Sequence, residues 1–267
     1  MPQEAFDPIA DTFDDTFTNS VVGRLQRQQV YFFLEKVLTK MSGKKVLELN
    51  CGTGADAIWL AQNNCEVKAT DLSMGMLQVT QKKVRKLGLE SKVQVQQLSI
   101  AQIATLPETQ QYDLIFSNFG GFNCLSPQTL KQISKPLSQR LRPGGHFVAV
   151  VMTDFCLWES IYFLAKFSFQ KAFRRFSKKA LQVTLGNGAS VDTWYYSPDQ
   201  FSRFFSNALQ QQDCFPVGFS IPPSYLDRAF QQHPNILQNL YRLEKKSIHF
   251  SFAKRSADHF FIHLTKP

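Results

Sequence analysis

Residues 46–54 read Val-Leu-Glu-Leu-Asn-Cys-Gly-Thr-Gly, an apolar run that ends in a glycine turn. The run predicts a buried strand, and the turn predicts the start of a helix. Gly52 and Gly54 permit a positive φ and let a ligand approach the backbone closely. Residues 52–57 also fit the G-x-G-x-x-A form of the dinucleotide fingerprint. The segment therefore indicates half of a nucleotide-binding sheet, but its glycines alone do not separate NAD from other adenosine ligands.

Acidic residues at the ends of the first two predicted strands narrow the choice of ligand. NAD would place its pyrophosphate over the helix N-terminus, where the carboxylate of Glu48 would repel it. S-Adenosylmethionine instead carries an ammonium and a sulfonium, and a nearby carboxylate suits both. Asp71 ends the second predicted strand, a place from which an acidic side chain accepts hydrogen bonds from ribose hydroxyls. Asp71 also fits a helix N-cap. We therefore expect S-adenosylmethionine as the cofactor.

Four successive segments resemble the motifs of class I S-adenosylmethionine-dependent methyltransferases, in that family's order and at its spacings. They are residues 48–54, 69–77, 112–118 and 141–145. The close match covers about residues 40–152, and the N-terminal Phe-Asp-Pro and Phe-Asp segments are similar to the family's N-terminal cap. The resemblance implies an α/β fold with a doubly wound, Rossmann-like sheet of seven strands. Most of these strands would be parallel, with the last one antiparallel.

The expected cofactor site follows from the turn, the strand ends and the resemblance. The resemblance places Leu98, Ser99 and Ile100 around the adenine. Arg27, on the predicted N-terminal helix, either reaches the cofactor carboxylate or serves as a solvated or ion-paired residue. The expected site comprises Glu48, Asn50, Cys51, Gly52, Thr53, Gly54, Asp71, Leu72, Met76, Leu98, Ser99, Ile100, Ser117, Asn118 and Arg27.

The sequence departs from the family pattern at several positions. Asn50 stands where the first glycine of the turn is usual, and asparagine is the next best residue for a positive φ. Ser99 stands where an aspartate often holds the adenine amino group. Phe119 and Gly120 replace the prolines that are typical of amide and nucleic-acid N-methylating relatives. That replacement favours an oxygen or carbon acceptor.

Length and patterning suggest one sheet domain with an elaborated second half. We expect an N-terminal cap and helix over residues 1–44 and a cofactor-binding core over 45–153. An insert over 154–212 is expected to act as a lid that binds the acceptor, or else as a structural elaboration. Residues 213–267 would supply strands six and seven. Within the insert, the spacing predicts one helix over 155–180, then a β-hairpin, then a helix capped by Ser197.

Composition limits the environment and the partners. Five cysteines are scattered without a C-x-x-C pair, which predicts a reduced, cytoplasmic protein with no metal site. The start of the chain lacks the apolar run of a signal peptide, and no 18-residue apolar stretch predicts a transmembrane segment. The net charge of +9 permits an acidic partner, but no RNA-binding motif accompanies it. We expect a small-molecule acceptor and no nucleic acid.

Catalytic residues are the least defined part of the prediction. Methyl transfer from a sulfonium needs a base only when the acceptor loses a proton as it reacts. The candidates are His259, Tyr195 and Tyr225, because each follows or begins a segment near the predicted pocket. The favoured function is methylation of a small hydrophobic or aromatic metabolite. The alternatives are an RNA or protein methyltransferase, and a protein that binds S-adenosylmethionine without turnover.

Overall fold

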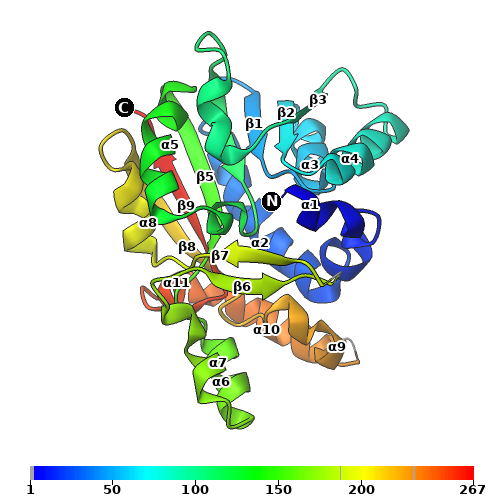
Figure 1. Cartoon of the computed structure of the whole chain (residues 1–267), viewed down its shortest axis with the longest axis vertical. Helices are drawn as coiled ribbons and strands as arrows, with labels where there is room; N and C mark the ends of the chain where they lie inside the picture. The colour runs from blue at the N-terminus through cyan, green and yellow to red at the C-terminus, as the bar shows by residue number, and fades with distance from the viewer. Residues whose placement is uncertain (1–2, 187, 231) are drawn as a thin grey trace.

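A seven-stranded sheet with the order β3-β2-β1-β4-β5-β9-β8 forms the centre of the computed structural model, which describes residues 3–186, 188–230 and 232–267 (Figure 1). Strand β9 runs antiparallel to both of its neighbours, and the remaining pairings are parallel. The strands are β1 (Lys45–Leu49), β2 (Glu66–Asp71), β3 (Val93–Gln97), β4 (Tyr112–Ser117), β5 (Leu141–Met152), β8 (Gln210–Val217) and β9 (His259–Thr265), with a separate hairpin of β6 (Leu181–Thr184) and β7 (Ser190–Thr193). The predicted doubly wound sheet with an antiparallel last strand is confirmed.

Helices cover both faces of the sheet. The described helices are α1 (Gln3–Phe6), η1 (Asp7–Ile9), η2 (Asp14–Thr18), α2 (Val21–Leu38), α3 (Ala55–Gln62), α4 (Met74–Lys86), η3 (Ile100–Thr105), η4 (Gly121–Cys124), α5 (Pro127–Gln139), α6 (Leu157–Ala165), α7 (Phe169–Ala172), η5 (Arg174–Phe176), α8 (Pro198–Phe205), η6 (Ser224–Leu226), α9 (Asp227–Phe230), α10 (Pro234–Ser247) and α11 (Ala253–Ser256). One apolar core lies between the sheet and α2, α3 and α4. A second lies between the opposite face and η3, α5 and α8. No helix in the described ranges is long and apolar enough to cross a membrane.

Central strands read as continuous apolar runs because both of their faces are covered. Every residue of β4 is buried, and β1 is buried from Val46 to Leu49. The carboxyl ends of the parallel strands meet at one edge of the sheet. At this edge the turns after β1, β2, β3 and β4 converge, which brings residues far apart in sequence to one place.

The insert after β5 differs from the single helix predicted over residues 155–180. The structure has α6, then α7, then the short η5, with the chain reversing at Phe167, whose φ is 55°. The reversal brings Glu159 of α6 against Arg174 and Arg175, at 2.7 Å and 2.9 Å. Arg175 also pairs with Asp258, 83 residues along the chain. The local helical spacing was misleading because this buried ion pairing, which is tertiary, determines the path of the chain.

The remaining elements of the insert agree with the prediction. Strands β6 and β7 form an antiparallel hairpin. Helix α8 begins with Pro198 at its first position, and the hydroxyl of Ser197 accepts a hydrogen bond from the backbone N–H of Gln200. In Figure 1 the hairpin crosses below the sheet, while α6 and α7 extend away from the rest of the molecule.

A histidine pair joins the last strands at the edge opposite to the glycine turn. Nδ1 of His146 in β5 lies 2.8 Å from Nε2 of His263 in β9, and Nδ1 of His263 lies 3.1 Å from the Asp213 carboxylate in β8. Burial, together with the neighbouring His263, lowers the pKa of His146 to about 4. Burial also lowers the pKa of His263. Both side chains are therefore neutral in the folded protein near pH 7.

We expect this pair to make the protein less stable in acid. In the unfolded chain, histidine protonates near pH 6.5, above the folded pKa of both groups, so the stability contributed by neutral histidines is lost as the pH falls from about 6.5 to 4. After allowance for solvent screening, the expected loss of unfolding free energy is about 1–2 kcal/mol. Urea unfolding at pH 7 and at mildly acidic pH should show a smaller loss for His146→Gln than for the unchanged protein. Equal losses would assign the acid sensitivity to other groups.

Candidate active site

The turn after β1 contains three left-handed residues. Asn50, Gly52 and Gly54 have φ values of 51°, 53° and 79°. Asn50 therefore adopts the conformation expected of the glycine that it replaces. Its side chain also joins two loops, because Nδ2 donates to the Asn118 carbonyl at 2.7 Å while Oδ1 accepts from the Ser117 hydroxyl. The turn after β1 and the loop after β4 are thus held together by one amide.

Asp71 fixes the turn from the neighbouring strand. One carboxylate oxygen accepts the backbone N–H of Gly52 at 2.8 Å, and the other accepts that of Ser73 at 2.9 Å. Burial raises the pKa of Asp71, and these backbone hydrogen bonds partly oppose the rise. Each carboxylate oxygen has a second lone pair, so Asp71 can accept further hydrogen bonds from a ligand.

A cavity of about 230 Å³ opens beside this turn. All of the expected cofactor residues line it except Glu48, Gly54 and Ser117. Gly54 is covered by α4, since a Cβ there would lie 2.5 Å from Cγ2 of Thr80. Ser117 instead positions Asn50. Further lining residues come from the N-terminal segment, the turn after β2, the start of α3, the loop after β4, and β7; they are Phe6, Phe13, Phe17, Thr18, Ala55, Asp56, Ser73, Phe119, Gly120, Gly121, Cys124, Leu125 and Val191.

Glu48 is a residue of β1 and is not part of the cavity wall. Its side chain is buried, and its Oε2 has no hydrogen-bond partner among the described residues. Burial raises the pKa of Glu48 well above its usual range, and the nearby Asp56 carboxylate raises it further, while Arg27 opposes both. Glu48 is therefore a buried acceptor with unused hydrogen-bonding capacity near the carboxyl end of β1.

Asp56 organises a polar cluster that the sequence analysis missed. It forms an ion pair with Arg27 of α2, accepts the Tyr31 hydroxyl at 2.8 Å, and accepts the Asn118 amide at 3.0 Å. Burial opposes the charge on Arg27, but the Asp56 carboxylate more than compensates and raises the Arg27 pKa. Arg27 is thus both ion-paired and part of the cavity wall, so the two roles weighed for it are compatible. The only sequence signal for Asp56 is an acid in the first turn of the helix after the glycines.

The N-terminal segment contributes to the cavity wall and is held in place by the side chains of Asp14 and Asp7. Asp14 accepts the Thr53 hydroxyl at 2.6 Å and forms an ion pair with Lys83. Asp7 accepts the backbone N–H of Gly75 at 3.0 Å. Burial raises the pKa of Asp14, but the hydrogen bonds from Lys83 and Thr53 and the charge of Lys83 together outweigh it, so the Asp14 pKa is lowered. These contacts fix the cap directly over the glycine turn and the start of α4.

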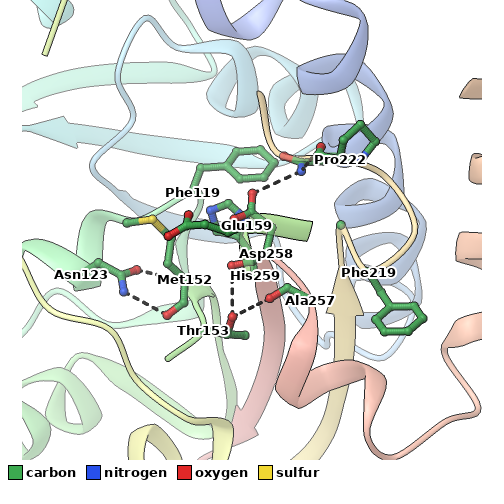
Figure 2. Close-up of polar contacts among 12 residues, drawn as sticks. Phe119, Asn123, Met152, Thr153, Glu159, Phe219, Pro222, Ala257, Asp258 and His259 are labelled. Atoms are coloured by element: carbon green, nitrogen blue, oxygen red, sulfur yellow. Dashed lines mark hydrogen bonds and ion pairs between the residues drawn. The ribbon is translucent and has the colours of Figure 1, made fainter. Parts of the chain in front are cut away.

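Phe119 forms the wall of the cavity on the β4 side. It has a φ of 42°, which is strained for a bulky residue, and its ring meets those of Phe17 and His259 edge-on at 5.6 Å and 5.4 Å. The guanidinium of Arg27 lies 5.1 Å from the centre of the Phe119 ring. Figure 2 shows the Phe119 ring beside His259 and the Asp258 carboxylate. The surrounding contacts hold Phe119 in one orientation.

The loop after β4 is also tied to the insert. The side-chain amide of Asn123 donates to the carbonyls of Met152 and Trp194 at 3.1 Å and 2.7 Å, and the first of these contacts is drawn in Figure 2. The Tyr196 hydroxyl donates to the Leu125 carbonyl. These contacts hold the hairpin next to the loop, and Val191 of the hairpin forms part of the cavity wall. That the insert opens and closes as a lid stays a prediction.

Two of the three catalytic candidates, His259 and Tyr195, lie away from the cavity wall. His259 lies behind Phe119, with Nδ1 at 3.3 Å from the Asp258 carboxylate. Tyr195 is buried under the guanidinium of Arg175, 5.0 Å from its ring centre, and burial raises the Tyr195 pKa. Neither residue is part of the cavity wall. The side chain of Tyr225 lies outside the described part of the structure.

Residues 46–145 match a protein family described as a methyltransferase domain. This central segment is similar to the class I S-adenosylmethionine-dependent methyltransferases. Over 144 residues the chain is 30% identical to a demethylmenaquinone methyltransferase of Clavibacter sepedonicus, covering 54% of this chain and 54% of that protein. Over 122 residues it is 25% identical to a ubiquinone biosynthesis O-methyltransferase of Alkalilimnicola ehrlichii, covering 43% and 44%. Matches to curated relatives span between 27% and 60% of the relative's own length.

Solved methyltransferases share the fold. The structure resembles geranyl diphosphate C-methyltransferase from Streptomyces coelicolor A3(2), solved with Mg²⁺, geranyl diphosphate and S-adenosyl-L-homocysteine, with a TM-score of 0.57 and 12% identity. That similarity covers 90% of this chain and 80% of the other. A S-adenosylmethionine-dependent methyltransferase from Listeria monocytogenes, described as putative, gives a TM-score of 0.59 at 17% identity, over 89% and 96% of the two chains.

S-Adenosylmethionine is the cofactor of this methyltransferase fold, and the cavity suits it chemically. Glu48 Oε2 is a buried acceptor and Arg27 Nε a buried donor, and neither has a partner among the described residues. A cofactor with an ammonium and a carboxylate at one end offers both missing partners. The remaining capacity of Asp71 matches a ribose, and the apolar side chains of Leu72, Leu98 and Ile100 match an adenine ring.

Proposed function

We propose that this methyltransferase transfers the methyl group of S-adenosylmethionine to an oxygen or carbon atom of a small hydrophobic or aromatic metabolite. The observation that carries the proposal is the cavity wall beyond the cofactor residues. It includes the apolar side chains of Phe17, Phe119, Leu125 and Val191 together with Gly120 and Gly121. Such a wall suits a flat or branched apolar acceptor, which gains free energy by leaving water.

The proposed cofactor contacts fall into three groups. We assign the amino-acid end to Arg27, Glu48, Asn50 and Asn118, around the turn after β1. Asp71 would accept hydrogen bonds from the ribose hydroxyls. Leu72, Met76, Leu98, Ser99 and Ile100 would enclose the adenine. Cys51, Gly52, Thr53 and Gly54 shape the turn, with Ser117 positioning Asn50.

In the proposed mechanism the protein acts mainly by positioning. S-Adenosylmethionine supplies a methyl group on a sulfonium with a neutral leaving group. Phe119 and the capping segment exclude water and orient the acceptor for in-line attack. Every described cavity carboxylate is already engaged, Asp56 with Arg27 and Asp71 with two backbone N–H groups. Desolvation raises the pKa of the Cys124 thiol to about 11, so it is not a base near pH 7.

It follows that the acceptor reacts without a base from the described cavity wall. Acceptors that ionise readily, such as acidic phenols and quinols, or electron-rich carbon atoms meet this condition. The basic charge of the chain gives little support to an RNA acceptor. Among the described lysines and arginines, only Arg27 lines the cavity, and its charge is matched by Asp56.

Two measurements test the proposal in sequence. Titration calorimetry should detect binding of S-adenosylmethionine, and radiolabelled cofactor should then transfer its methyl group to members of a panel of phenols, quinols and prenyl compounds. Cys124→Trp is expected to fill the acceptor end, abolishing transfer while leaving cofactor affinity within about twofold, because Cys124 lines the cavity beyond the cofactor residues. Gln128→Trp, at an exposed position nearby, is the matched control.

The outcomes separate the alternatives. Absence of cofactor binding at millimolar concentration would overturn the whole proposal. Binding without transfer to any acceptor of the panel would favour a protein that binds the cofactor without turnover. Transfer to RNA or protein, but not to the small molecules, would overturn the acceptor class alone.

A further inference from the structure

The insert carries apolar side chains that the fold leaves in water. We call residues 157–179, which comprise α6, α7 and η5, the helical projection. Figure 1 shows α6 and α7 extending beyond the rest of the molecule. The side chain of Phe167 at its turn is 85% exposed, and that of Phe169 is 63% exposed. The other exposed apolar residues of the projection are Ile161, Leu164, Phe173 and Phe176. A cluster of this kind usually marks an interaction site.

The positive φ of Phe167 is a second indication that its exposed side chain has a binding role. With a φ of 55°, Phe167 occupies the left-handed region, which favours glycine or asparagine and is strained for a large aromatic residue. Phe167 follows the C-cap residue of α6, a position where a glycine would complete the turn at lower cost. Neither the turn geometry nor burial in the core therefore accounts for a phenylalanine here. An external partner that receives the ring does account for it.

The charges around these side chains define the chemistry of the partner. Between residues 155 and 189 the sequence has six basic residues and a single acid, Glu159. That acid is buried and pairs with Arg174 and Arg175, inside the molecule. Lys166, Lys171, Lys178 and Lys179 remain exposed around the aromatic side chains. The ammonium of Lys166 lies 4.3 Å from the ring centre of Tyr162, which places charge and apolar surface together.

We propose that the helical projection docks this protein on the surface of a bilayer that contains anionic phospholipids. Phe167 and Phe169 enter the boundary between headgroups and acyl chains, while the surrounding lysines contact the phosphates. A second copy of this chain is a poorer partner, because pairing two projections would bring like charges together.

Docking would orient the active site. The projection begins five residues after β5 ends at Met152, and therefore leaves the sheet at the same edge as the cavity. A protein held by the projection thus presents this edge towards the lipid. The docking itself does not depend on which acceptor is methylated, so it can be tested without a substrate.

Vesicle sedimentation with the full chain tests the proposal. Vesicles of phosphatidylcholine with about one third phosphatidylglycerol should bind the protein, and vesicles of phosphatidylcholine alone should bind it far more weakly. The double variant Phe167→Ser/Phe169→Ser is expected to bind anionic vesicles at least about tenfold more weakly. Raising the salt to about 0.5 M should also release the protein, because it screens the lysines.

Matched controls keep the test decisive. Leu87→Ser removes a 50% exposed apolar side chain that also lies among basic residues, at the end of α4, and should leave vesicle binding unchanged. Thermal unfolding of the double variant should match the unchanged protein, because both phenylalanines are exposed. Failure to bind anionic vesicles, or equal binding by the double variant, would overturn the proposal. A dimer that the double variant abolishes, without vesicle binding, would assign the surface to a second copy.

Discussion

Replacing Asp71 with alanine is expected to lower the affinity for S-adenosylmethionine about 100-fold. The carboxylate holds the backbone N–H groups of Gly52 and Ser73 and is the proposed acceptor for the ribose hydroxyls. Hydrogen bonds to a charged group contribute about 1.5–3 kcal/mol each, so the loss of two of them costs roughly 3 kcal/mol or more. Titration calorimetry of the purified variant measures the change directly.

Two further variants make the Asp71 result interpretable. Glu66→Ala alters an exposed acid at the opposite end of the same strand, β2, and should bind the cofactor as the unchanged protein does. Asp71→Asn keeps one acceptor oxygen and should fall between the two. If Asp71→Ala binds the cofactor with unchanged affinity, Asp71 must be removed from the proposed site.

Arg175→Ala is expected to be the most destabilising single change in the insert. Its guanidinium donates to Glu159 at 2.9 Å and to the Asp258 carboxylate at 2.8 Å, and its side chain is 7% exposed. Removing one partner from a buried ion pair leaves an uncompensated charge, which costs about 3–5 kcal/mol. Burial opposes the charge on Asp258, yet His259 and Arg175 together lower the Asp258 pKa, so this carboxylate would remain ionised and poorly paired.

Urea unfolding followed by circular dichroism measures this effect. Lys171→Ala, in the same insert but exposed, is the matched control and should change the unfolding free energy by less than about 0.5 kcal/mol. A cost below about 1 kcal/mol for Arg175→Ala would mean that solvent or His259 compensates the two acids. Because Asp258 precedes His259, which touches Phe119, the same variant also tests whether the network supports the cavity wall.

The core was predictable because its signals are local. The apolar run before Gly52, the glycines themselves and the acid at Asp71 each follow from backbone geometry within a few residues. The strand before the turn and the strand that ends at Asp71 were predicted for the same reason. Asn50 could be placed correctly because asparagine is among the few residues that tolerate a left-handed backbone.

The parts that were missed depend on distant partners. The spacing of residues 155–180 predicted one helix, whereas the structure breaks this segment, exposes Phe169, Phe173 and Phe176, and buries Arg175. That outcome depends on Asp258, which no local pattern connects to the insert. The Arg27–Asp56 pair was missed for the same reason, although each residue alone lies in an ordinary helical position. His259 was proposed because it begins the last strand and Tyr195 because it follows the hairpin, but packing against Phe119 and Arg175 keeps them out of the cavity wall.

The side-chain amide of Asn50 restricts which substitutions can accumulate during evolution in the turn after β1 and the loop after β4. A Cβ on Gly121 would lie 2.1 Å from Asn50 Oδ1, so the two positions share a single volume. A side chain at 121 becomes tolerable only after position 50 has become smaller. The order of substitutions is therefore constrained. A smaller residue at position 50 must come first, and a larger residue at position 121 then prevents a return to asparagine at position 50.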